Sequence, residues 1–436
     1  MDLNIDFDKY LRVLDEPLIL SMGRVENVIG LSIESKGPEA KLGDLCKIYA
    51  GEEEFIYAEV IGFKDGRTLL SPYQATDGIS IGCRVENTNE PLMVTVSDKL
   101  LGHVLDSLGN CPELPDLDGA RVEVDTQALE AMDRVVIDEV LSLGVKAVDG
   151  LLTLGKGQRI GIFAGSGVGK STLMGMFARN TNADVNVIAL IGERGREVKE
   201  FIDRDLGPEG MARSVVVVAT SDRTALERKK AAMTATAIAE YFRDQGKDVL
   251  LMMDSLTRFS MAQREIGLAS GEPPVSRGYP PSVYGQMPRL LERAGKNAKG
   301  SITGLYTVLV DGDDFNEPIT DTARGILDGH IVLDRKLAQR NHYPAIDVLA
   351  SVSRCMSGIV SKEHKRYAAR LKSTLATYRD AEDLINIGAY KAGSNPDIDY
   401  SIKMYKSIDQ YLCQETDEKI DYEESFARLE QMFGGE

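Results

Sequence analysis

The glycine-rich run AGSGVGKST, residues 164–172, limits the possible folds of this chain more than any other feature of its sequence. It lies between an apolar run and the helix-forming run TLMGMFARN. A strand, a glycine loop and a helix in this order turn backbone N–H groups and the positive end of the helix dipole toward a phosphate. The usual motif has a glycine where this chain has Ala164, and alanine is small enough for a strand end. The run therefore predicts a phosphate-binding loop inside an α/β domain.

Each part of this loop has an expected role in holding ATP. The glycines leave room for the close approach of phosphate oxygens. Lys170 is expected to reach the β- and γ-phosphates, and the Ser171 hydroxyl is expected to bind Mg²⁺. A glycine-rich turn followed by a surface lysine is the less favoured alternative. The predicted nucleotide-binding residues of the loop are Gly165, Ser166, Gly167, Val168, Gly169, Lys170, Ser171 and Thr172.

Two acidic residues follow apolar runs that are typical of buried strands. Asp254 ends the run VLLMMD and is the candidate for the carboxylate on the magnesium side of the site. Glu193 follows VIALIG and is the candidate for orienting or deprotonating the attacking water. An acid after an apolar strand is common, so Asp254 gains its meaning from the phosphate loop. Glu193 alone is equally compatible with a carboxylate that stabilises the N-terminus of a helix.

The pattern of apolar, polar and turn-forming residues changes along the chain, and these changes divide it into five predicted segments. Residues 1–18 carry an apolar stripe of helical spacing, which predicts a helix that packs on its own domain or docks a partner. Residues 19–95 contain short β-rich runs separated by turns, which predict a small barrel or sandwich. Residues 96–134 are expected to be a linker, 135–355 an α/β domain, and 356–436 an all-helical C-terminal domain.

The α/β segment alternates between strand and helix patterns, which predicts a mostly parallel sheet covered by helices. A helix is expected over Thr224–Gln245, where strong helix formers precede Gly246. The expected buried strands are Arg159–Ala164, Val185–Leu190, Ser214–Thr220, Val249–Asp254 and Leu305–Val310.

Composition excludes several classes of protein. A formal net charge of −17 disfavours nucleic acid as a partner. Apolar runs such as Val249–Met253 are far shorter than the roughly 18 residues that cross a bilayer, and the acidic start MDLNIDFDKY is unlike a secretion signal. Five widely spaced cysteines and four histidines show neither disulfide nor metal-ligand spacing. We therefore expect a cytoplasmic protein with reduced thiols.

Longer runs resemble one protein family over nearly the whole chain. GKGQRIGIFAGSGVGKST, ALIGERGREVKEFI, DSLTRFSMAQREIGLASGEPPVSRGYPPSVY, HYPAIDVLASVSR and DLINIGAYKAGS are similar to type III protein-export ATPases, above all the flagellar one. Such ATPases are relatives of the catalytic head of rotary ATP synthases. The resemblance implies an N-terminal β-barrel, a RecA-like P-loop core and a C-terminal helical domain. It also implies an ATP-hydrolysing ring of six identical copies that drives export of flagellar proteins.

The family's motifs extend the candidate site to four further residues. The resemblance places Arg194 beside the catalytic Glu193 and Arg258 near the γ-phosphate. It implies that Tyr343 stacks on adenine and that Arg354 reaches the nucleotide of a neighbouring subunit, where it would neutralise charge on the transferred phosphoryl group. From the residues alone, a half-buried packing tyrosine and a solvated arginine remain the alternatives.

The resemblance also implies partners. The N-terminal helix would bind a dimeric regulator, and Gly271–Tyr284 would face the ring pore, where the family grips a rod-like stalk protein; the alternative for the latter is a rigid surface loop. Export substrates, their chaperones and an export gate at the membrane complete the set, with the ATPase peripheral to the inner membrane.

Three other functions are compatible with parts of the sequence. An ATPase of an injection apparatus shares the same motifs. A rotary ATP synthase subunit is disfavoured by GEPPVSRGYPPSVY and GDDFNEP. A hexameric RNA translocase shares the core and a GKGQR-like run, but it needs a basic, aromatic platform that residues 21–92 do not supply.

Overall fold

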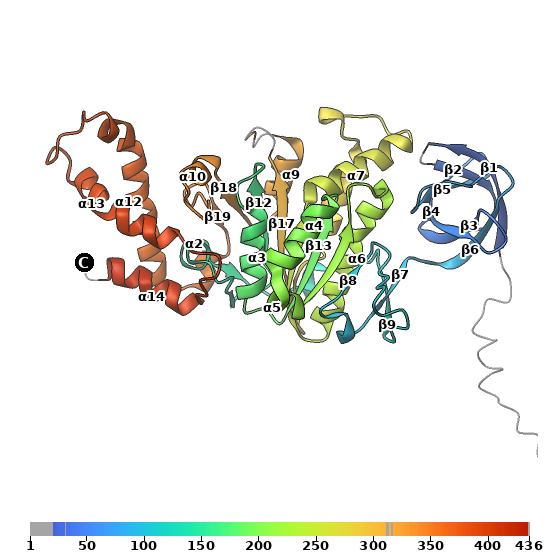
Figure 1. The fold of residues 1–436 in the computed structure, drawn as a ribbon, viewed down its shortest axis with the longest axis horizontal. Helices are drawn as coiled ribbons and strands as arrows, with labels where there is room; N and C mark the ends of the chain where they lie inside the picture. The colour runs from blue at the N-terminus through green and yellow to red at the C-terminus, as the bar shows by residue number, and fades with distance from the viewer. Residues whose placement is uncertain (1–20, 31, 311–313, 315–316, 435–436) are drawn as a thin grey trace, which may run out of the picture. The chain divides into compact units, whose positions relative to one another are not determined.

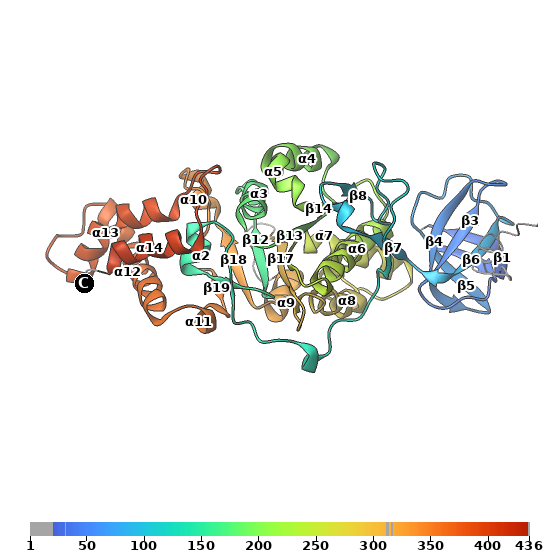
Figure 2. The same cartoon turned by 90° about the horizontal axis from the view of Figure 1, so that it is seen from below.

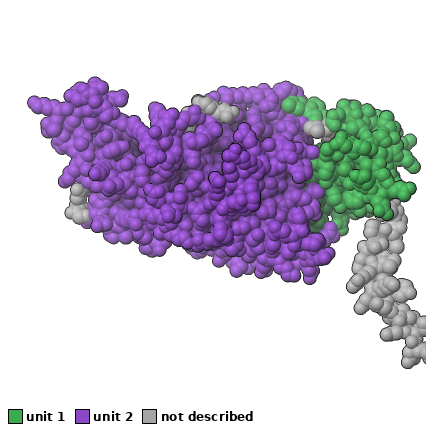
Figure 3. Space-filling view, viewed as in Figure 1, with its two compact units in different colours: residues 1–93, 268–272 green, residues 94–267, 273–436 purple. Residues whose placement is uncertain are grey.

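The computed structural model describes residues 21–30, 32–310, 314 and 317–434. The helix predicted over residues 1–18 lies outside them. The described chain falls into two compact units (Figure 3), which we treat separately. Unit 1 runs to Met93 and includes Leu268–Glu272, and unit 2 comprises Val94–Gly267 and Pro273–Glu436.

Unit 1 is a closed antiparallel barrel (Figure 1). Alternate side chains point inward and form its core, with Val25, Ile33, Ile48, Leu70 and Val85 almost fully buried. This alternation is the reason that short runs of β-branched and aliphatic residues fold as strands here. Of the two predicted possibilities, the structure is a barrel. In spatial order its strands are β1 (Ser21–Ile29), β2 (Ser32–Lys36), β5 (Arg67–Pro72), β4 (Phe55–Lys64), β3 (Asp44–Tyr49) and β6 (Arg84–Pro91).

Unit 2 is built on a nine-stranded sheet. Its six central strands are parallel, and the core strands are buried along nearly their whole length because helices cover both faces. In spatial order the strands are β19 (Val352–Ser353), β18 (Gly329–Leu333), β12 (Arg159–Ala164), β17 (Ser301–Leu309), β15 (Asp248–Asp254), β13 (Val185–Ile191), β14 (Ser214–Ala219) and β8 (Val104–Leu105), with β16 (Gly295–Lys296) antiparallel to β17.

Helices lie on both faces of this sheet (Figure 2). One face carries α3 (Lys170–Asn180), α4 (Gly195–Glu200) and α5 (Gly207–Ala212), with the short helix Phe201–Leu206 between the last two. The other carries α6 (Ala225–Asp244), α8 (Pro281–Leu291) and α9 (Pro318–Ile326). The remaining elements near the sheet are the 14-residue helix α7 (Leu256–Ala269), the 3-10 turn Ser276–Gly278, and α10 (Arg335–Gln339).

The predicted elements of the core agree closely with the observed ones. Strand β12 has the predicted bounds, and helix α6 lies inside Thr224–Gln245. Thr224 caps this helix, because its hydroxyl accepts from the Glu227 N–H at 3.2 Å while the Glu227 carboxylate accepts from the Thr224 N–H at 3.1 Å. Strand β17 begins at Ser301, earlier than predicted, because its first residues, SITG, lack an apolar run.

The segment predicted as a linker, residues 96–134, contains two strands that the sequence did not reveal. Strand β8 pairs in parallel with β14 at the edge of the central sheet, and β9 (Ala120–Glu123) pairs with β7 (Met93–Val96). Elements of two to four residues are too short for an alternating pattern to be detected. The other elements of this segment are the 3-10 turns Asp98–Leu100 and Ala131–Asp133.

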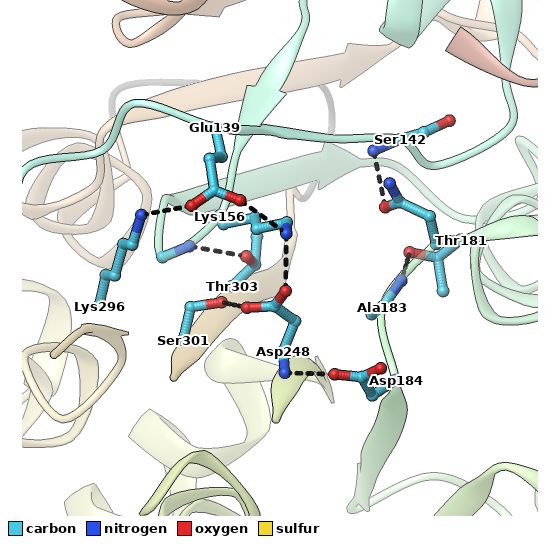
Figure 4. Close-up of polar contacts among 12 residues, drawn as sticks. Glu139, Ser142, Lys156, Thr181, Ala183, Asp184, Asp248, Lys296, Ser301 and Thr303 are labelled. Carbon is cyan, nitrogen blue, oxygen red and sulfur yellow. Dashed lines mark hydrogen bonds and ion pairs between the residues drawn. The ribbon is translucent and has the colours of Figure 1, made fainter. Parts of the chain in front are cut away.

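A network of ion pairs and hydrogen bonds connects the segment that leads into the α/β domain to the amino edge of the sheet (Figure 4). The Lys156 ammonium lies between the carboxylates of Glu139, at 2.9 Å, and Asp248, at 2.7 Å. Lys296 bonds the other Glu139 oxygen at 3.0 Å. These hydrogen bonds and charges lower the pKa of Glu139 to about 2. Residues that precede β10 (Val140–Leu141) are therefore tied to the start of β15 and to β16.

The C-terminal part of unit 2 is helical, as predicted. Its side chains share one continuous core with the sheet domain, which includes Leu371, Tyr411 and Phe433. Among the described residues, no helix combines the length and the apolar character needed to cross a membrane. The elements are α11 (Met356–Ile359), which contacts β11 (Leu154–Gly155), and α12 (Lys362–Asn386), α13 (Pro396–Leu412) and α14 (Tyr422–Phe433), which pack against α2 (Lys146–Leu151).

Candidate nucleotide-binding site

The strand ends that carry the predicted residues meet at one edge of the sheet. Ala164 pairs with Leu309, and Leu190 pairs with Asp254, so β12, β17, β15 and β13 end at similar levels. Because all four strands are parallel, their carboxyl ends lie together, which is where open α/β sheets bind ligands. The phosphate loop, Glu193 and Asp254 are therefore brought into one region by the topology alone.

The phosphate loop has the open geometry that its glycines predict. Gly167 and Gly169 adopt φ of 77° and 87°, a region that favours glycine. An added Cβ at Gly167 would meet nothing within 4 Å, so space around it is open. Helix α3 starts at Lys170, directly after Gly169. The loop lines a cleft of about 920 Å³, together with Glu193, Arg194, Glu197, Arg258 and Tyr343.

Lys170 lies between the two predicted carboxylates. Its ammonium is 2.5 Å from Asp254 Oδ1 and 3.8 Å from Glu193 Oε1. Asp254 is buried and also accepts a hydrogen bond from the Thr307 hydroxyl at 2.7 Å. A buried carboxylate needs such partners to stay charged. Thr307, on the neighbouring strand, fixes the orientation of Asp254 and was not identified from the sequence.

Glu193 has an acidity suited to accepting a proton near neutral pH. Burial, with a further contribution from the negative charge of Asp254, raises its pKa to about 7. Glu197, one turn along α4, shares a hydrogen bond with Glu193 and an ion pair of 2.8 Å with Arg194. Burial opposes ionisation of Glu197, yet these two contacts hold its pKa below the ordinary value. The two carboxyl groups therefore differ in acidity, with the proton favoured on Glu193.

Arg258 and Arg194 differ in their surroundings. Arg258 lines the cleft beside Gly192, where an added Cβ would lie 3.1 Å from the Arg258 Cβ. Its buried Nε finds no hydrogen-bond acceptor among the described residues. Arg194 is 80% exposed at its side chain. The structure thus brings a buried, unsatisfied cationic donor to the cleft at Arg258, while Arg194 extends into solvent.

Tyr343 lies beside Gly169 of the phosphate loop. Its ring carbon Cε1 would be 3.3 Å from a Cβ added at Gly169, and its side chain is exposed to the cleft. The Tyr343 carbonyl accepts a hydrogen bond from the Gln414 N–H at 3.0 Å. An aromatic face beside the phosphate loop is available for a base to stack on.

The segment 413–416, after α13, also lines the cleft and was missed by sequence reasoning. The Gln414 side chain accepts from the Lys146 N–H at 2.9 Å and donates to the Gly144 carbonyl at 2.8 Å. No local pattern marks this segment, because its role depends on contacts with residues about 270 positions away in the chain.

Arg354 does not join this cleft. It follows β19, and its N–H donates to the Asp328 carbonyl at 3.0 Å, at the amino end of β18. Strand β18 reaches the level of the phosphate loop only at Leu333, which pairs with Ala164. Four residues of strand correspond to about 13 Å. Arg354 is exposed at the opposite edge of the sheet from its own phosphate loop.

Sequence spacing also gave no sign of one cluster of potential metal ligands. Atoms of His342, Asp409 and Cys413 lie within 4.8 Å of one another. His342 Nδ1 is 2.9 Å from Asp409 Oδ1, so an ordinary hydrogen bond accounts for the contact. This cluster lies next to Tyr343 and joins it to α13.

The cleft fits a magnesium–nucleotide complex in its donor chemistry. The loop is an open cradle, Arg258 carries an unsatisfied buried donor, and Tyr343 supplies an aromatic face. Ser171 and Asp254 supply the hydroxyl and carboxylate oxygens that Mg²⁺ prefers. The cleft thus offers residues whose chemistry suits the phosphate, base and metal parts of such a ligand.

Comparison with known proteins identifies the family. Models of the ATP synthase alpha/beta family match residues 25–89, as its beta-barrel domain, and residues 144–353, as its nucleotide-binding domain. The model of the T3SS EscN ATPase C-terminal domain matches residues 360–431. The Flagellum-specific ATP synthase of Bacillus subtilis (strain 168) is 57% identical over 423 residues, which are 95% of each chain. This chain belongs to the flagellar and type III secretion ATPase family.

Two further comparisons place this ATPase within the family. The type 3 secretion system ATPase of Xanthomonas euvesicatoria is 52% identical over 93% of each chain. A solved structure of the assembled ATPase EscN in complex with its central stalk EscO, from enteropathogenic E. coli, is 47% identical with a TM-score of 0.87. That match covers 94% of this ATPase and 99% of EscN. The predicted family, its three-part fold and an ATP-hydrolysing activity are confirmed.

Proposed function

We propose that this ATPase works as a ring of six identical copies in which each subunit completes the catalytic site of its neighbour. The observation that carries this proposal is the position of Arg354. The cleft of one chain contains the phosphate loop, Glu193 and Asp254. Arg354, however, is exposed at the other end of strand β18, and the length of that strand, about 13 Å, separates it from the level of the loop. A second copy offers the simplest source of an arginine for the γ-phosphate. The assembled state of EscN supports self-association.

We assign the chemistry to the residues of the cleft. Lys170 and Arg258 bind phosphate oxygens, and the raised pKa of Glu193 suits it to orient the attacking water and accept its proton. Ser171 and Asp254 would hold Mg²⁺, which supplies charge neutralisation on the β- and γ-phosphates. Arg194 pairs with Glu197 and thereby keeps that carboxylate charged beside Glu193. Gly165–Thr172 hold the phosphates through backbone N–H groups.

We propose that hydrolysis drives the unfolding and export of flagellar proteins. The flagellar relative is 57% identical, and the secretion ATPase of Xanthomonas is 52% identical, so an injection apparatus is the second candidate. By analogy with EscN and its stalk EscO, a stalk protein would occupy the ring pore beside Gly271–Tyr284. We further propose a dimeric regulator on residues 1–18, chaperoned substrates, and a cytoplasmic location at an export gate on the inner membrane.

The export proposal is tested by deleting the gene and restoring it with the wild type or with Glu193→Gln. We expect the deletion to abolish filaments and secreted flagellin, the wild type to restore both, and Glu193→Gln to restore neither. Motile cells with intact filaments after deletion would contradict a flagellar role. Loss of injected effector proteins with normal filaments would favour the second candidate.

Tyr343→Ala should raise the KM for ATP about 5- to 150-fold, because stacking of an aromatic ring on a base contributes about 1–3 kcal/mol. The kcat should change little, since the tyrosine contacts no reacting atom. Tyr343→Phe, which keeps the ring, is the matched control and should retain the wild-type KM. Steady-state kinetics with ATP and with inorganic tripolyphosphate, which lacks a base, separate stacking from a general distortion of the cleft.

A further inference from the structure

The run GKGQR, residues 155–159, contains a fully buried glutamine that the catalytic chemistry does not use. The Gln158 amide donates to the Asp328 carbonyl at 3.1 Å and to the Ser353 hydroxyl at 3.1 Å. Its oxygen accepts from the Gly155 N–H at 3.0 Å. The Gln158 amide group therefore donates to both residues that position the backbone at Arg354. Ser353 directly precedes Arg354, and the Asp328 carbonyl also accepts a hydrogen bond from the Arg354 N–H.

Arg159 strengthens the same turn. Its Nε and Nη2 donate to the two carboxylate oxygens of Asp328 at 3.0 and 3.2 Å, a bidentate contact. The Arg159 N–H bonds the same carboxylate at 3.1 Å, and the Asp328 N–H donates to the Arg159 carbonyl at 2.8 Å. The side chain of Arg159 is only 14% exposed. Asp328 is thus held on both its backbone and its side chain by the residue that begins β12.

Arg354 itself has little else to hold it. Its exposed guanidinium donates to the Arg324 carbonyl at 3.4 Å, a long contact. The direction of the side chain is therefore set mainly by the backbone of residues 353–354. That backbone is positioned by the pairing of Ser353 with Gly329 and by the contacts of Gln158 and Asp328.

We propose that Gln158 and Asp328 are positioning residues for Arg354, and that strand β12 couples the nucleotide site of a subunit to the arginine that this subunit offers its neighbour. The six-residue strand carries the phosphate loop at its carboxyl end and the Gln158–Arg159 contacts at its amino end. A buried strand is stiff, so a shift of the loop is transmitted to the turn that presents Arg354. This inference rests on the proposed role of Arg354 in the neighbouring site.

The first test is Gln158→Met, which keeps the volume of the side chain and removes its hydrogen bonds. We expect a fluorescent ATP analogue to bind as in wild type, the KM to change less than threefold, and kcat to fall at least tenfold. Asn186→Leu is the matched control: this fully buried amide lies at the same edge of the sheet and donates to Ala178 and Ser214 at 2.9 and 3.2 Å, away from Arg354. It should lose similar thermal stability and retain kcat. If Gln158→Met fails to fold, Gln158→Glu replaces it, because it keeps the shape and the accepting oxygen.

The deciding test mixes defective subunits. Glu193→Gln keeps Arg354 but hydrolyses ATP very slowly, whereas Gln158→Met keeps its catalytic cleft but presents Arg354 poorly. Rings formed from both should hydrolyse ATP faster than the sum of the separate variants, because intact clefts then meet intact arginines. The mixture of Arg354→Ala with Glu193→Gln is run in parallel.

The outcomes are distinguishable. Rescue with Gln158→Met supports the inference. A Gln158→Met enzyme with wild-type kcat overturns it, as does absence of rescue when Arg354→Ala is rescued; the proposed ring function then stands. If neither mixture shows rescue, Arg354 does not act in the site of the neighbouring subunit. The proposed function is then contradicted on this point, and the inference about Gln158 is contradicted with it.

Discussion

Glu193→Gln should bind ATP with unchanged affinity and hydrolyse it about 10²- to 10⁴-fold more slowly, the usual contribution of a positioned acid–base group. Glutamine has the shape of glutamate and can still orient a water, but it accepts no proton. The buried site, with the charge of Asp254 close by, raises the pKa of Glu193 to about 7. The wild-type kcat should therefore decline as the pH falls through this value, since the protonated acid is inactive as a base.

Two measurements separate this role from a general loss of structure. The residual activity of Glu193→Gln should lack the decline near pH 7. Glu200→Gln, at the end of helix α4, which begins after Glu193, and paired with Arg196 at 2.9 Å outside the cleft, should retain the wild-type rate and pH profile. A Glu193→Gln enzyme with full turnover would show that another group accepts the proton.

Arg354→Ala should lower the kcat of assembled rings by about 10³- to 10⁵-fold, the range seen when an arginine that stabilises phosphoryl-transfer charge is removed. Because Arg354 is exposed away from the cleft of its own chain, nucleotide binding by separate subunits should be unaffected. The activity of the wild type per milligram should rise with protein concentration as rings form, and that of Arg354→Ala should stay low throughout.

The control is Arg428→Ala, which removes a partly exposed arginine from α14, where it pairs with Glu424 at 2.6 Å and with Glu418 at 3.1 Å. It should keep the concentration dependence of the wild type. Arg354→Lys retains the charge without the planar fork of donors and should fall between the two. If Arg354→Ala matches the wild type at every concentration, the neighbouring subunit contributes no arginine at this position.

The core of the fold could be predicted because its signals are local. Strand β12 and the loop that follows it are marked by an apolar run and closely spaced glycines, and Asp254 directly ends such a run. Their proximity then follows from parallel pairing, which places all carboxyl ends at one edge. The barrel was predicted only as one of two options, since closure depends on the pairing of β1 with β6, strands far apart in the sequence.

The parts that were missed depend on distant contacts. Thr307 orients Asp254 from another strand, and Gln414 reaches the cleft from the C-terminal helices. Neither residue belongs to a pattern that suggests chemistry. Strand β8 is two residues long and exists only because β14 offers it a free edge. Gln158 was noted as part of GKGQR, but its link to Arg354 runs through residues nearly two hundred positions away.

The hydrogen bond that the Gln414 N–H donates to the Tyr343 carbonyl ties the ring proposed to stack on adenine to the segment that follows α13. The helices after residue 355 share a hydrophobic core with the sheet domain, to which Tyr411 and Leu371 belong. A movement of these helices would therefore displace Tyr343 as well. If Tyr343 stacks on adenine as proposed, a force on the C-terminal helices would change the rates of ATP entry and ADP release, and nucleotide exchange would in turn act on these helices.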